Sequence, residues 1–367
     1  MRAGIPAESR PAERRVAGVP DTVTTLVAAG LAVDVQAGAG AHAHATDEAY
    51  RAAGAEVTAD HPAGRAEVVL SVQPTEHVDR LREGDVTISF LQPSTELDHV
   101  RALRDRGVTA FSLDLLPRVT RAQTADALSS QALVAGYRAV LTAAERLPRF
   151  LPMFTTAAGT VPPAKVLVLG AGVAGLQAIA TARRLGAVVE AYDVRKAAAE
   201  EVRSLGARFL ELDLETQTGV YASQQSEDTL ARQRELIADR VAASDVVIST
   251  AAIPGRKAPV LVTTDMLKAM PAGSVVVDLA AESGGNVTGS VPGEEIRVGD
   301  VLLYGAKNMP STMPAHASRL YARNVANLLL LMTRDGEVRP DLSDEVLDGC
   351  CLTHQGEVRH APTRELL

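Results

Sequence analysis

The stretch from Lys165 to Asp193 constrains the fold more than any other part of the chain. An apolar run at Val166–Leu169 leads into the hexapeptide GAGVAG at 170–175. A helical pattern follows over Leu176–Leu185, and a second apolar run ends at Asp193. Strand, glycine turn, helix, strand and acid in this order predict a βαβ unit that binds a dinucleotide.

Each glycine of the turn has its own predicted role. Gly170 makes the tight turn, Gly172 lets the backbone approach a pyrophosphate, and Gly175 allows the helix to pack close to the sheet. The helix that follows offers free N–H groups and the positive end of its dipole to the phosphates. The hexapeptide is therefore the predicted phosphate site.

Asp193 predicts the choice of dinucleotide. A carboxylate at the end of the second strand accepts hydrogen bonds from an adenosine ribose diol and repels a 2′-phosphate. This favours NAD over NADP. Arg195 and Lys196, directly beyond, are the opposing argument, because basic residues there favour a 2′-phosphate.

The uncharged run Val166–Ala182 has an alternative interpretation as a membrane span. Lys165 and Arg183 bound it at the short limit for spanning, and it contains three glycines. The N-terminus also lacks the apolar core of a signal peptide. We expect a soluble, cytoplasmic chain with no membrane span of its own.

Charge and cysteine usage exclude several classes of function. The net charge is −8 and no basic block occurs, so nucleic acid and anionic membranes are poor candidate partners. Cys350 and Cys351 are adjacent, a spacing that rarely forms a disulfide, and no metal-ligand pattern surrounds them. We expect a reducing compartment and no metal site.

Alternating strand and helix patterns predict an α/β fold of two Rossmann-like, doubly wound parallel-sheet domains with a nucleotide cleft between them. The expected N-terminal domain is discontinuous, with residues 1–125 plus 317–367. A connecting helix is expected over 126–146, and an NAD-binding Rossmann domain over 147–316. The Pro-, Thr- and Gly-rich segment 147–163 is interpreted as a hinge.

The expected strands share short apolar runs, and the expected helices share apolar residues at helical spacing. Strands are expected at Ala3–Ile5, Ala32–Val35, Val68–Ser71, Val86–Leu91, Thr109–Ser112, Val166–Leu169, Val188–Tyr192, Arg208–Leu210, Asp245–Ser249, Ser274–Asp278 and Val301–Tyr304. Helices are expected at Pro20–Ala29, Thr46–Ala53, Glu96–Asp105, Asp126–Arg146, Leu176–Leu185, Lys196–Ser204, a stretch ending near Val241, Thr264–Met270 and Ala317–Met332.

Several segments together resemble one superfamily. They are IPAESRPAERRVAGVP (Ile5–Pro20), RVTRAQTADALSSQALVAGYRAV (Arg118–Val140), GAGVAGLQAIATARRLGA from Gly170, STAAIPGRKAP (Ser249–Pro259) and VVVDLAAESGGN (Val275–Asn286). They are similar to the NAD(H)-binding domain of proton-translocating NAD(P) transhydrogenase and to alanine dehydrogenase. The resemblance covers essentially the whole chain.

The two kinds of member differ in chemistry. Alanine dehydrogenase has a substrate-binding Lys and a catalytic His where this chain has Gln73 and Gln92, and an Asp where it has Glu282. Oxidative deamination needs acid–base catalysis and a carboxylate anchor. Hydride transfer between two nicotinamide rings needs only rings held face to face. The substitutions favour the transhydrogenase; Arg15 is common to both and does not discriminate.

The resemblance implies site residues on both domains. Those that orient the nicotinamide and transfer hydride are Arg118, Gln123, Asp126, Ser129 and Tyr221. Those that contact the dinucleotide are Arg118, Val119, Thr120, Arg121, Gln123, Gly170, Gly172, Val173, Ala174, Gly175, Asp193, Val194, Arg195, Val220, Gln233 and Ala252. Asp126 has an alternative role as a helix N-cap and Arg121 as a solvated surface charge.

Tyr221 belongs to a segment, Gly219-Val220-Tyr221, that resembles the family's mobile loop, whose Tyr closes over the nucleotide. Val220 stands where the family often has a second Gly. An ordinary surface loop is the alternative interpretation of this segment.

The family implies NAD(H) on this chain and NADP(H) on a partner subunit. It also implies a homodimer, membrane-embedded partner subunits that translocate protons, and peripheral association with the inner membrane through them. Two alternatives stay open from the sequence. One is an NAD-dependent amino-acid dehydrogenase with an altered pocket, and the other is a non-catalytic NAD sensor.

Overall fold

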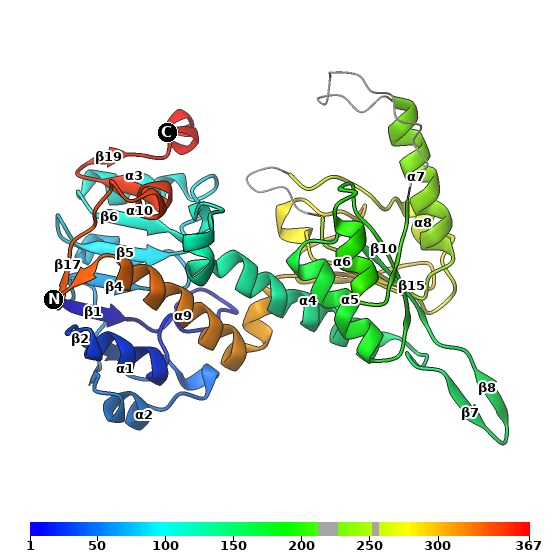
Figure 1. Ribbon diagram of the computed structural model, residues 1–367, viewed down its shortest axis with the longest axis horizontal. Helices are drawn as coiled ribbons and strands as arrows, with labels where there is room; N and C mark the ends of the chain where they lie inside the picture. The colour runs from blue at the N-terminus through cyan, green and yellow to red at the C-terminus, as the bar shows by residue number, and fades with distance from the viewer. Residues whose placement is uncertain (212–226, 252–256) are drawn as a thin grey trace. The chain divides into compact units, whose positions relative to one another are not determined.

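The computed structural model describes residues 1–211, 227–251 and 257–367, without the side chains of 227–234. The chain divides into two units, which we call the first unit (Met1–Gln131 with Pro310–Leu367) and the second unit (Ala132–Met309). Helix α4 (Ala127–Arg146) contains the boundary at which the chain passes from the first unit, ending at Gln131, to the second, beginning at Ala132 (Figure 1).

The first unit is built on an eight-stranded sheet in the order β19-β18-β6-β5-β4-β1-β2-β3. Six of these strands are parallel: β1 (Arg2–Ile5), β2 (Ala32–Gln36), β3 (Glu56–Thr58), β4 (Val68–Leu70), β5 (Val86–Ser89) and β6 (Thr109–Ser112). Strands β18 (Cys351–His354) and β19 (Glu357–Val358) add antiparallel at one edge.

Helices cover both faces of this sheet. The first face buries α1 (Pro20–Ala28), α2 (Asp47–Ala52) and α9 (Pro314–Leu331), and the second buries α3 (Leu97–Asp105). Alternate strand residues serve the two faces, since Val68 and Leu70 join the first core and Val69 joins the second. The short helices α10 (Glu345–Cys350) and α11 (Ala361–Leu366) lie near the C-terminus.

The second unit has a seven-stranded sheet in the order β11-β10-β9-β12-β13-β15-β14. Its parallel strands are β9 (Lys165–Leu169), β10 (Val188–Tyr192), β11 (Arg208–Phe209), β12 (Val246–Ser249), β13 (Val275–Asp278) and β15 (Val301–Gly305). One core holds α4, α5 (Val173–Arg184) and α6 (Ala198–Ser204). The other holds α7 (Glu227–Ala242) and α8 (Thr264–Lys268). The doubly wound α/β class is therefore confirmed in both units.

Each parallel sheet also carries antiparallel strands at one edge, which the sequence analysis did not predict. Besides β18 and β19, strand β14 (Glu295–Val298) pairs antiparallel with β15 and makes the predicted six-stranded sheet seven-stranded. Strand β3 was also not predicted. Strands β3, β14 and β19 lie at sheet edges, and β3 (EVT) and β14 (EIRV) have no fully buried residue, so neither shows an apolar run. Strand β18 lies between β6 and β19. Gln355 and Gly356, both with positive φ, form the tight turn that joins β18 to β19.

The segment interpreted as a hinge contains a β-hairpin. Strands β7 (Phe154–Thr156) and β8 (Gly159–Val161) pair only with each other, and all their residues are exposed. Figure 1 shows this hairpin extending away from the sheet of the second unit. Across the described residues, no helix is both long and apolar enough to cross a membrane.

Candidate dinucleotide site

The candidate site of the second unit lies where its strand order reverses. From β9 the chain proceeds outward to β10 and β11, and then returns to β12 on the other side of β9. The carboxyl ends of β9 and β12 therefore flank a topological switch point, which is where open α/β sheets bind ligands. The hexapeptide 170–175 follows β9 directly.

The three glycines of this turn sit in three different surroundings. Gly170 has a φ of +97°, and a Cβ on it would lie 2.7 Å from Thr250 Oγ1. A Cβ on Gly175 would lie 2.8 Å from the carbonyl carbon of Gly170. At Gly172 a Cβ would meet no atom of the described residues within 4 Å. Protein packing explains Gly170 and Gly175, whereas at Gly172 the open space fits an incoming ligand.

Helix α5 begins earlier than predicted, at Val173 rather than Leu176. Gly172 is its extended N-cap residue, and its carbonyl accepts the N–H of Leu176 at 2.8 Å. Val173, Ala174 and Gly175 therefore form the first turn, whose N–H groups have no partner within the helix. Gly172 and Val173 are exposed, so this turn presents its donors to solvent or to an anion.

Asp193 follows β10 and is nearly buried. Its carboxylate accepts the N–H of Ala171 at 2.7 Å and the backbone N–H of Arg195 at 2.8 Å. The Arg195 guanidinium adds two bonds of 3.0 Å. Burial alone would raise the pKa of Asp193, but these bonds outweigh it and the pKa is lowered. The group is a carboxylate at neutral pH.

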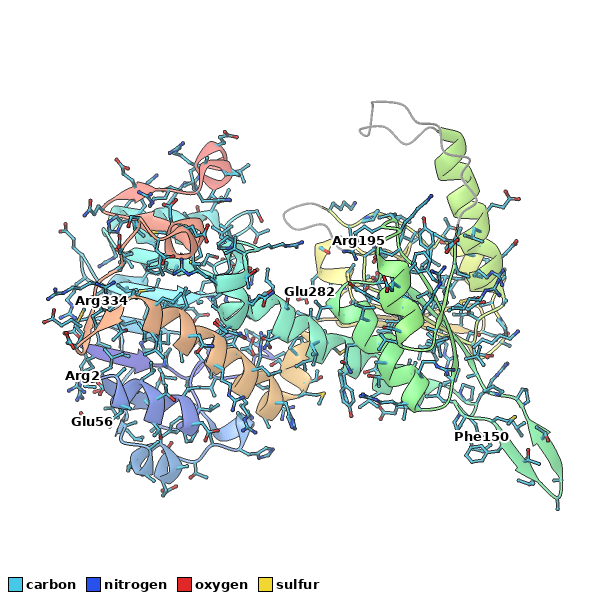
Figure 2. The ribbon with its side chains drawn as sticks, viewed as in Figure 1. Arg2, Glu56, Phe150, Arg195, Glu282 and Arg334 are labelled. Atoms are coloured by element: carbon cyan, nitrogen blue, oxygen red, sulfur yellow. The ribbon has the colours of Figure 1, made fainter. Side chains whose placement is uncertain are left out.

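Arg195 is one of the two basic residues that favoured NADP in the sequence analysis. Its guanidinium is paired with Asp193, and its Nη2 also donates to the carbonyl of Ala171 at 3.2 Å. Figure 2 labels Arg195 beside helices α5 and α6. Its charge is compensated within this arrangement, which favours a ribose diol over a 2′-phosphate. Val194, between Asp193 and Arg195 in the sequence, is 65% exposed.

A buried polar network supports the segments after β12 and β13, and the sequence analysis missed it. Asn286 donates to the carbonyls of Ala251 and Pro259, both at 2.8 Å, and accepts the Ser249 hydroxyl at 2.6 Å. Asp278 accepts the N–H groups of Ala280 and Asn286 at 3.0 Å. Asn286 was part of a quoted motif, but nothing local in the sequence indicated its partners.

The first unit carries the other predicted residues. Arg118 precedes a short 3₁₀-helix, Thr120–Ala125, that contains Thr120, Arg121 and Gln123. All four side chains are exposed, and Val119 is half-buried. Two asparagines of α9 hold this segment: Asn324 and Asn327 each donate to the carbonyl of Thr124 at 2.9 Å. The Arg121 side chain is 58% exposed and forms an ion pair of 2.6 Å with Asp344, which fits the alternative of a surface charge, and its nucleotide role stays a prediction.

Asp126 and Ser129 form the cap of α4. The Asp126 carboxylate accepts the Ser129 N–H at 2.9 Å and the Ser129 hydroxyl at 2.6 Å. This is the N-cap role that the sequence analysis weighed as the alternative. Capping leaves further acceptor positions on the carboxylate, so a nucleotide role stays a prediction for both residues.

The first unit also has a switch point, between β1 and β4. A cavity of about 210 Å³ lies there, lined by Glu8 of the loop after β1 and by Gln73 of the segment after β4, and buried polar side chains pack next to it. The Arg15 guanidinium donates to Glu13 at 2.8 and 2.7 Å and to Gln131 at 2.9 Å, and it is buried. Gln73 donates to Glu13 at 2.9 Å and accepts Gln92 at 3.1 Å. Gln73 and Gln92, which stand where the sequence analysis places the Lys and His of alanine dehydrogenase, are therefore hydrogen-bonded to each other.

Four of the predicted residues cannot be placed. Val220, Tyr221 and Ala252 lie outside the described residues, as does the side chain of Gln233. Glu282 is placed: its carboxylate accepts the backbone N–H of Asn308 at 2.8 Å, and Figure 2 labels it.

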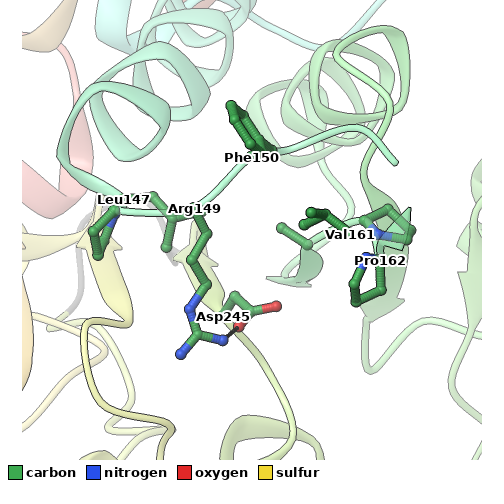
Figure 3. A pocket seen from close by; sticks show the side chains of 9 residues that line it. Leu147, Arg149, Phe150, Val161, Pro162 and Asp245 are labelled. Carbon is green, nitrogen blue, oxygen red and sulfur yellow. Dashed lines mark hydrogen bonds and ion pairs between the residues drawn. The ribbon is translucent and has the colours of Figure 1, made fainter. Parts of the chain in front are cut away.

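A cavity of about 610 Å³ lies at the opposite end of the second sheet from the glycine turn. Figure 3 shows it between the base of the hairpin, with Phe150 and Val161, and Asp245, which precedes β12. Arg149 pairs with Asp245 at 2.6 Å across its floor. Since it lies at the amino ends of β9 and β12, it is not the dinucleotide site.

Comparison with known proteins identifies the family of the chain. The model of "Alanine dehydrogenase/PNT, N-terminal domain" matches residues 4–135, and that of the C-terminal domain matches residues 139–361. The chain is 43% identical to NAD(P) transhydrogenase subunit alpha of Cereibacter sphaeroides, covering 99% of this chain and 72% of that one. It is 31% identical to the alanine dehydrogenase of Mycobacterium tuberculosis, covering 97% of this chain and 94% of that one.

A solved structure gives the same picture. The crystal structure of transhydrogenase from Sinorhizobium meliloti superposes with a TM-score of 0.90 at 45% identity, over 98% of this chain and 100% of that one.

Proposed function

The chain belongs to the alanine dehydrogenase/PNT family, and on that premise we propose that it is the NAD(H)-binding subunit of a proton-translocating NAD(P) transhydrogenase. The family implies NAD(H) binding, and the relatives named transhydrogenase subunit alpha support a subunit role in such an enzyme. The proposed reaction passes a hydride between NAD(H) on this chain and NADP(H) on a partner subunit.

One observation carries this choice over the amino-acid dehydrogenase. At the first switch point Gln73 and Gln92 are hydrogen-bonded to each other, and Gln73 also bonds Glu13. Neither amide accepts or releases a proton near neutral pH, and neither carries a positive charge to anchor a substrate carboxylate. Arg15 carries a positive charge that could anchor a substrate carboxylate, but its guanidinium is hydrogen-bonded to Glu13 and Gln131.

The second unit supplies what dinucleotide binding needs. The open space at Gly172 and the first turn of α5 fit a pyrophosphate, and the ionised Asp193 fits a ribose diol. When NAD(H) is bound, its nicotinamide ring supplies the hydride donor or acceptor. We propose that Arg118, Asp126 and Ser129 orient that ring, that Gln123 reaches the partner's nucleotide, and that Tyr221 closes over the site.

The same proposal names the remaining partners. The NADP(H) site and the proton path would lie on a beta subunit and on membrane-embedded subunits. The chain would then sit at the cytoplasmic face of the inner membrane through those subunits.

A coupled assay tests the proposed function. The chain is mixed with a transhydrogenase NADP(H)-binding domain from a relative, NADPH is added, and reduction of an NAD⁺ analogue is followed by its absorbance. Transfer that requires both proteins supports the proposal. NADH formation from L-alanine and NAD⁺ without a partner would favour the amino-acid dehydrogenase. NADH binding without transfer in any mixture would favour the sensor.

The hairpin β7–β8 supports the proposed homodimer. Phe150, Met153, Phe154 and Val161 are between 43% and 61% exposed, and the rings of Phe150 and Phe154 stack edge to face at 4.8 Å. A two-stranded hairpin is barely stable alone, and contiguous exposed apolar side chains mark protein contacts. We propose that this hairpin packs on a second copy. Light scattering tests this: the double variant Phe150→Ser, Phe154→Ser should be monomeric where the native chain is dimeric.

A further inference from the structure

Gly136 is an unexpected residue in the middle of helix α4. Glycine inside a helix costs about 1 kcal/mol relative to alanine. The residue is buried, and the rest of the helix is rich in alanine and leucine. A residue that destabilises its own helix calls for a reason outside that helix.

The reason is a close approach of two backbones. A Cβ on Gly136 would overlap the carbonyl oxygen of Ala174 and would lie 2.8 Å from its carbonyl carbon and 3.0 Å from its Cα. Ala174 is in the first turn of α5. Because the crowded atoms belong to the main chain, no side-chain rotation could relieve the overlap. An alanine at position 136 would push the two helices apart.

The first turn of α5 is therefore held on two sides. Gly175 packs on the Gly170 turn, and the neighbouring residue Ala174 packs on Gly136. The side at Gly172 is open. Below this contact, Val140 and Ala143 of α4 lie in the same core as residues of α5. Two protein surfaces thus fix the turn whose N–H groups face the open side.

We propose that Gly136 is a positioning residue for the pyrophosphate of NAD(H). Through Ala174 it sets where the first turn of α5 places its N–H donors, and so it sets the affinity for the phosphates. The adenosine end depends instead on Asp193, at the end of β10. This inference rests on NAD(H) binding by the second unit.

The test compares ligands with and without the pyrophosphate. For Gly136→Ala we expect the affinity for ADP-ribose and NADH to fall by roughly tenfold, which corresponds to about 1.4 kcal/mol. Adenosine binding, followed by NMR titration, should change less than twofold. Ala132→Gly, which destabilises the same helix by about 1 kcal/mol, is the matched control and should leave both affinities unchanged.

Equal losses for adenosine and ADP-ribose would overturn the proposal, because a loosened domain would weaken both. No loss for either ligand would overturn it as well. If Gly136→Ala does not fold, Val140→Ala takes its place, since it loosens α4 one turn away without adding an atom. It should weaken ADP-ribose more than adenosine, and equal effects would again refute the inference. Failure of the native chain to bind NADH would instead reject the function on which it rests.

Discussion

The two switch points of this chain share a topology and differ in what fills them. In the second unit only residues 170–172 separate β9 from α5, and the helix N-terminus is open. In the first unit residues 6–19 separate β1 from α1, and Glu8, Glu13 and Arg15 of that loop turn back over the strand ends. A parallel sheet supplies the location of a site, and the loop after the first strand decides how much of that space protein side chains take up. In the first unit a cavity of about 210 Å³ remains beside them.

The carboxylates at the two places also differ. Asp193 has a lowered pKa because hydrogen bonds from Arg195 and Ala171 outweigh its burial. Burial raises the pKa of Glu8 to about 7, although the N–H groups of Val72 and Gln73 donate to it. At neutral pH one carboxylate is kept charged beside an open turn, and the other is partly protonated where it lines the cavity of the first unit. The difference suits an anchor for a ribose diol in the second unit only.

The largest expected effect comes from filling the open turn. Gly172 has φ −80° and ψ −167°, which valine adopts without strain, and a Cβ there meets no atom in the part of the chain that the structure describes. We expect Gly172→Val to leave the thermal unfolding temperature unchanged and to weaken NADH binding on the order of a hundredfold, as seen by fluorescence titration. Ala52→Val, at an exposed position of the first unit, is the control. Native affinity in Gly172→Val would mean that the second switch point is not the phosphate site.

The first unit is expected to act through the segment after β6 rather than through its switch point. Gln123 is exposed there, on a turn held by Asn324 and Asn327. Gln123→Ala should leave NADH binding nearly intact and slow hydride transfer by up to about a hundredfold, because a misplacement of about 1 Å has costs of that order. Stopped-flow transfer in the reconstituted complex measures this.

Arg118→Ala gives the contrast for that experiment. It should weaken NADH binding as well, because it removes a donor to phosphate or carboxamide. If Gln123→Ala transfers hydride at the native rate, this segment is not the contact with the partner's nucleotide.

A smaller effect is expected at Asp193. Asp193→Ala removes the ribose acceptor and should weaken NADH binding by roughly 1–3 kcal/mol. It also releases Arg195 from its carboxylate partner, so the preference for NADH over NADPH should shrink. Parallel titrations with NADH and NADPH measure both changes, with the exposed Glu201→Ala as control. A native chain that binds the two nucleotides equally would contradict the predicted cofactor choice.

Local chemistry explains which parts of the fold could be predicted. The hexapeptide was interpretable because its glycine spacing is itself a local pattern, and Gly175 also packs on Gly170, five residues before it. The edge strands β3, β14 and β19 were missed because each is short and begins with an exposed glutamate, which leaves no apolar run to recognise. The start of α5 was placed three residues late, since the glycine turn obscured the beginning of its apolar pattern.

The candidate site was harder to predict than the fold, because its contacts join residues from different elements. Gly136 and Asn286 both lay in segments that resembled the family, yet their partners Ala174 and Pro259 come from other elements. A pattern along the chain cannot show a backbone contact between two helices. Asp126 illustrates the converse: its capping bond to Ser129 is local, and the sequence therefore offered that interpretation beside the nucleotide role.

The smallest expected effect separates the two carboxylates by pH. The pKa of Glu8 is raised in the folded chain from 4.5 to about 7, so its protonated form is favoured by folding. Its contribution to stability is fully present below about 4.5 and is lost as the pH rises through about 7. Glu8→Gln cannot titrate, although it loses one acceptor for the N–H groups of Val72 and Gln73 at every pH.

We therefore expect the unfolding temperature of the native chain, compared with that of Glu8→Gln, to fall by a few degrees between pH 5 and pH 8. The offset between the two proteins reports the lost hydrogen bond, and only its change with pH reports the titration. Asp193→Asn should show the opposite sign at lower pH, because a lowered pKa stabilises the fold above the ordinary value and that contribution is lost as the pH falls. If the unfolding temperatures of the native chain and Glu8→Gln change in parallel with pH, Glu8 does not titrate between pH 5 and pH 8. The contrast between the two sites would then rest on packing alone.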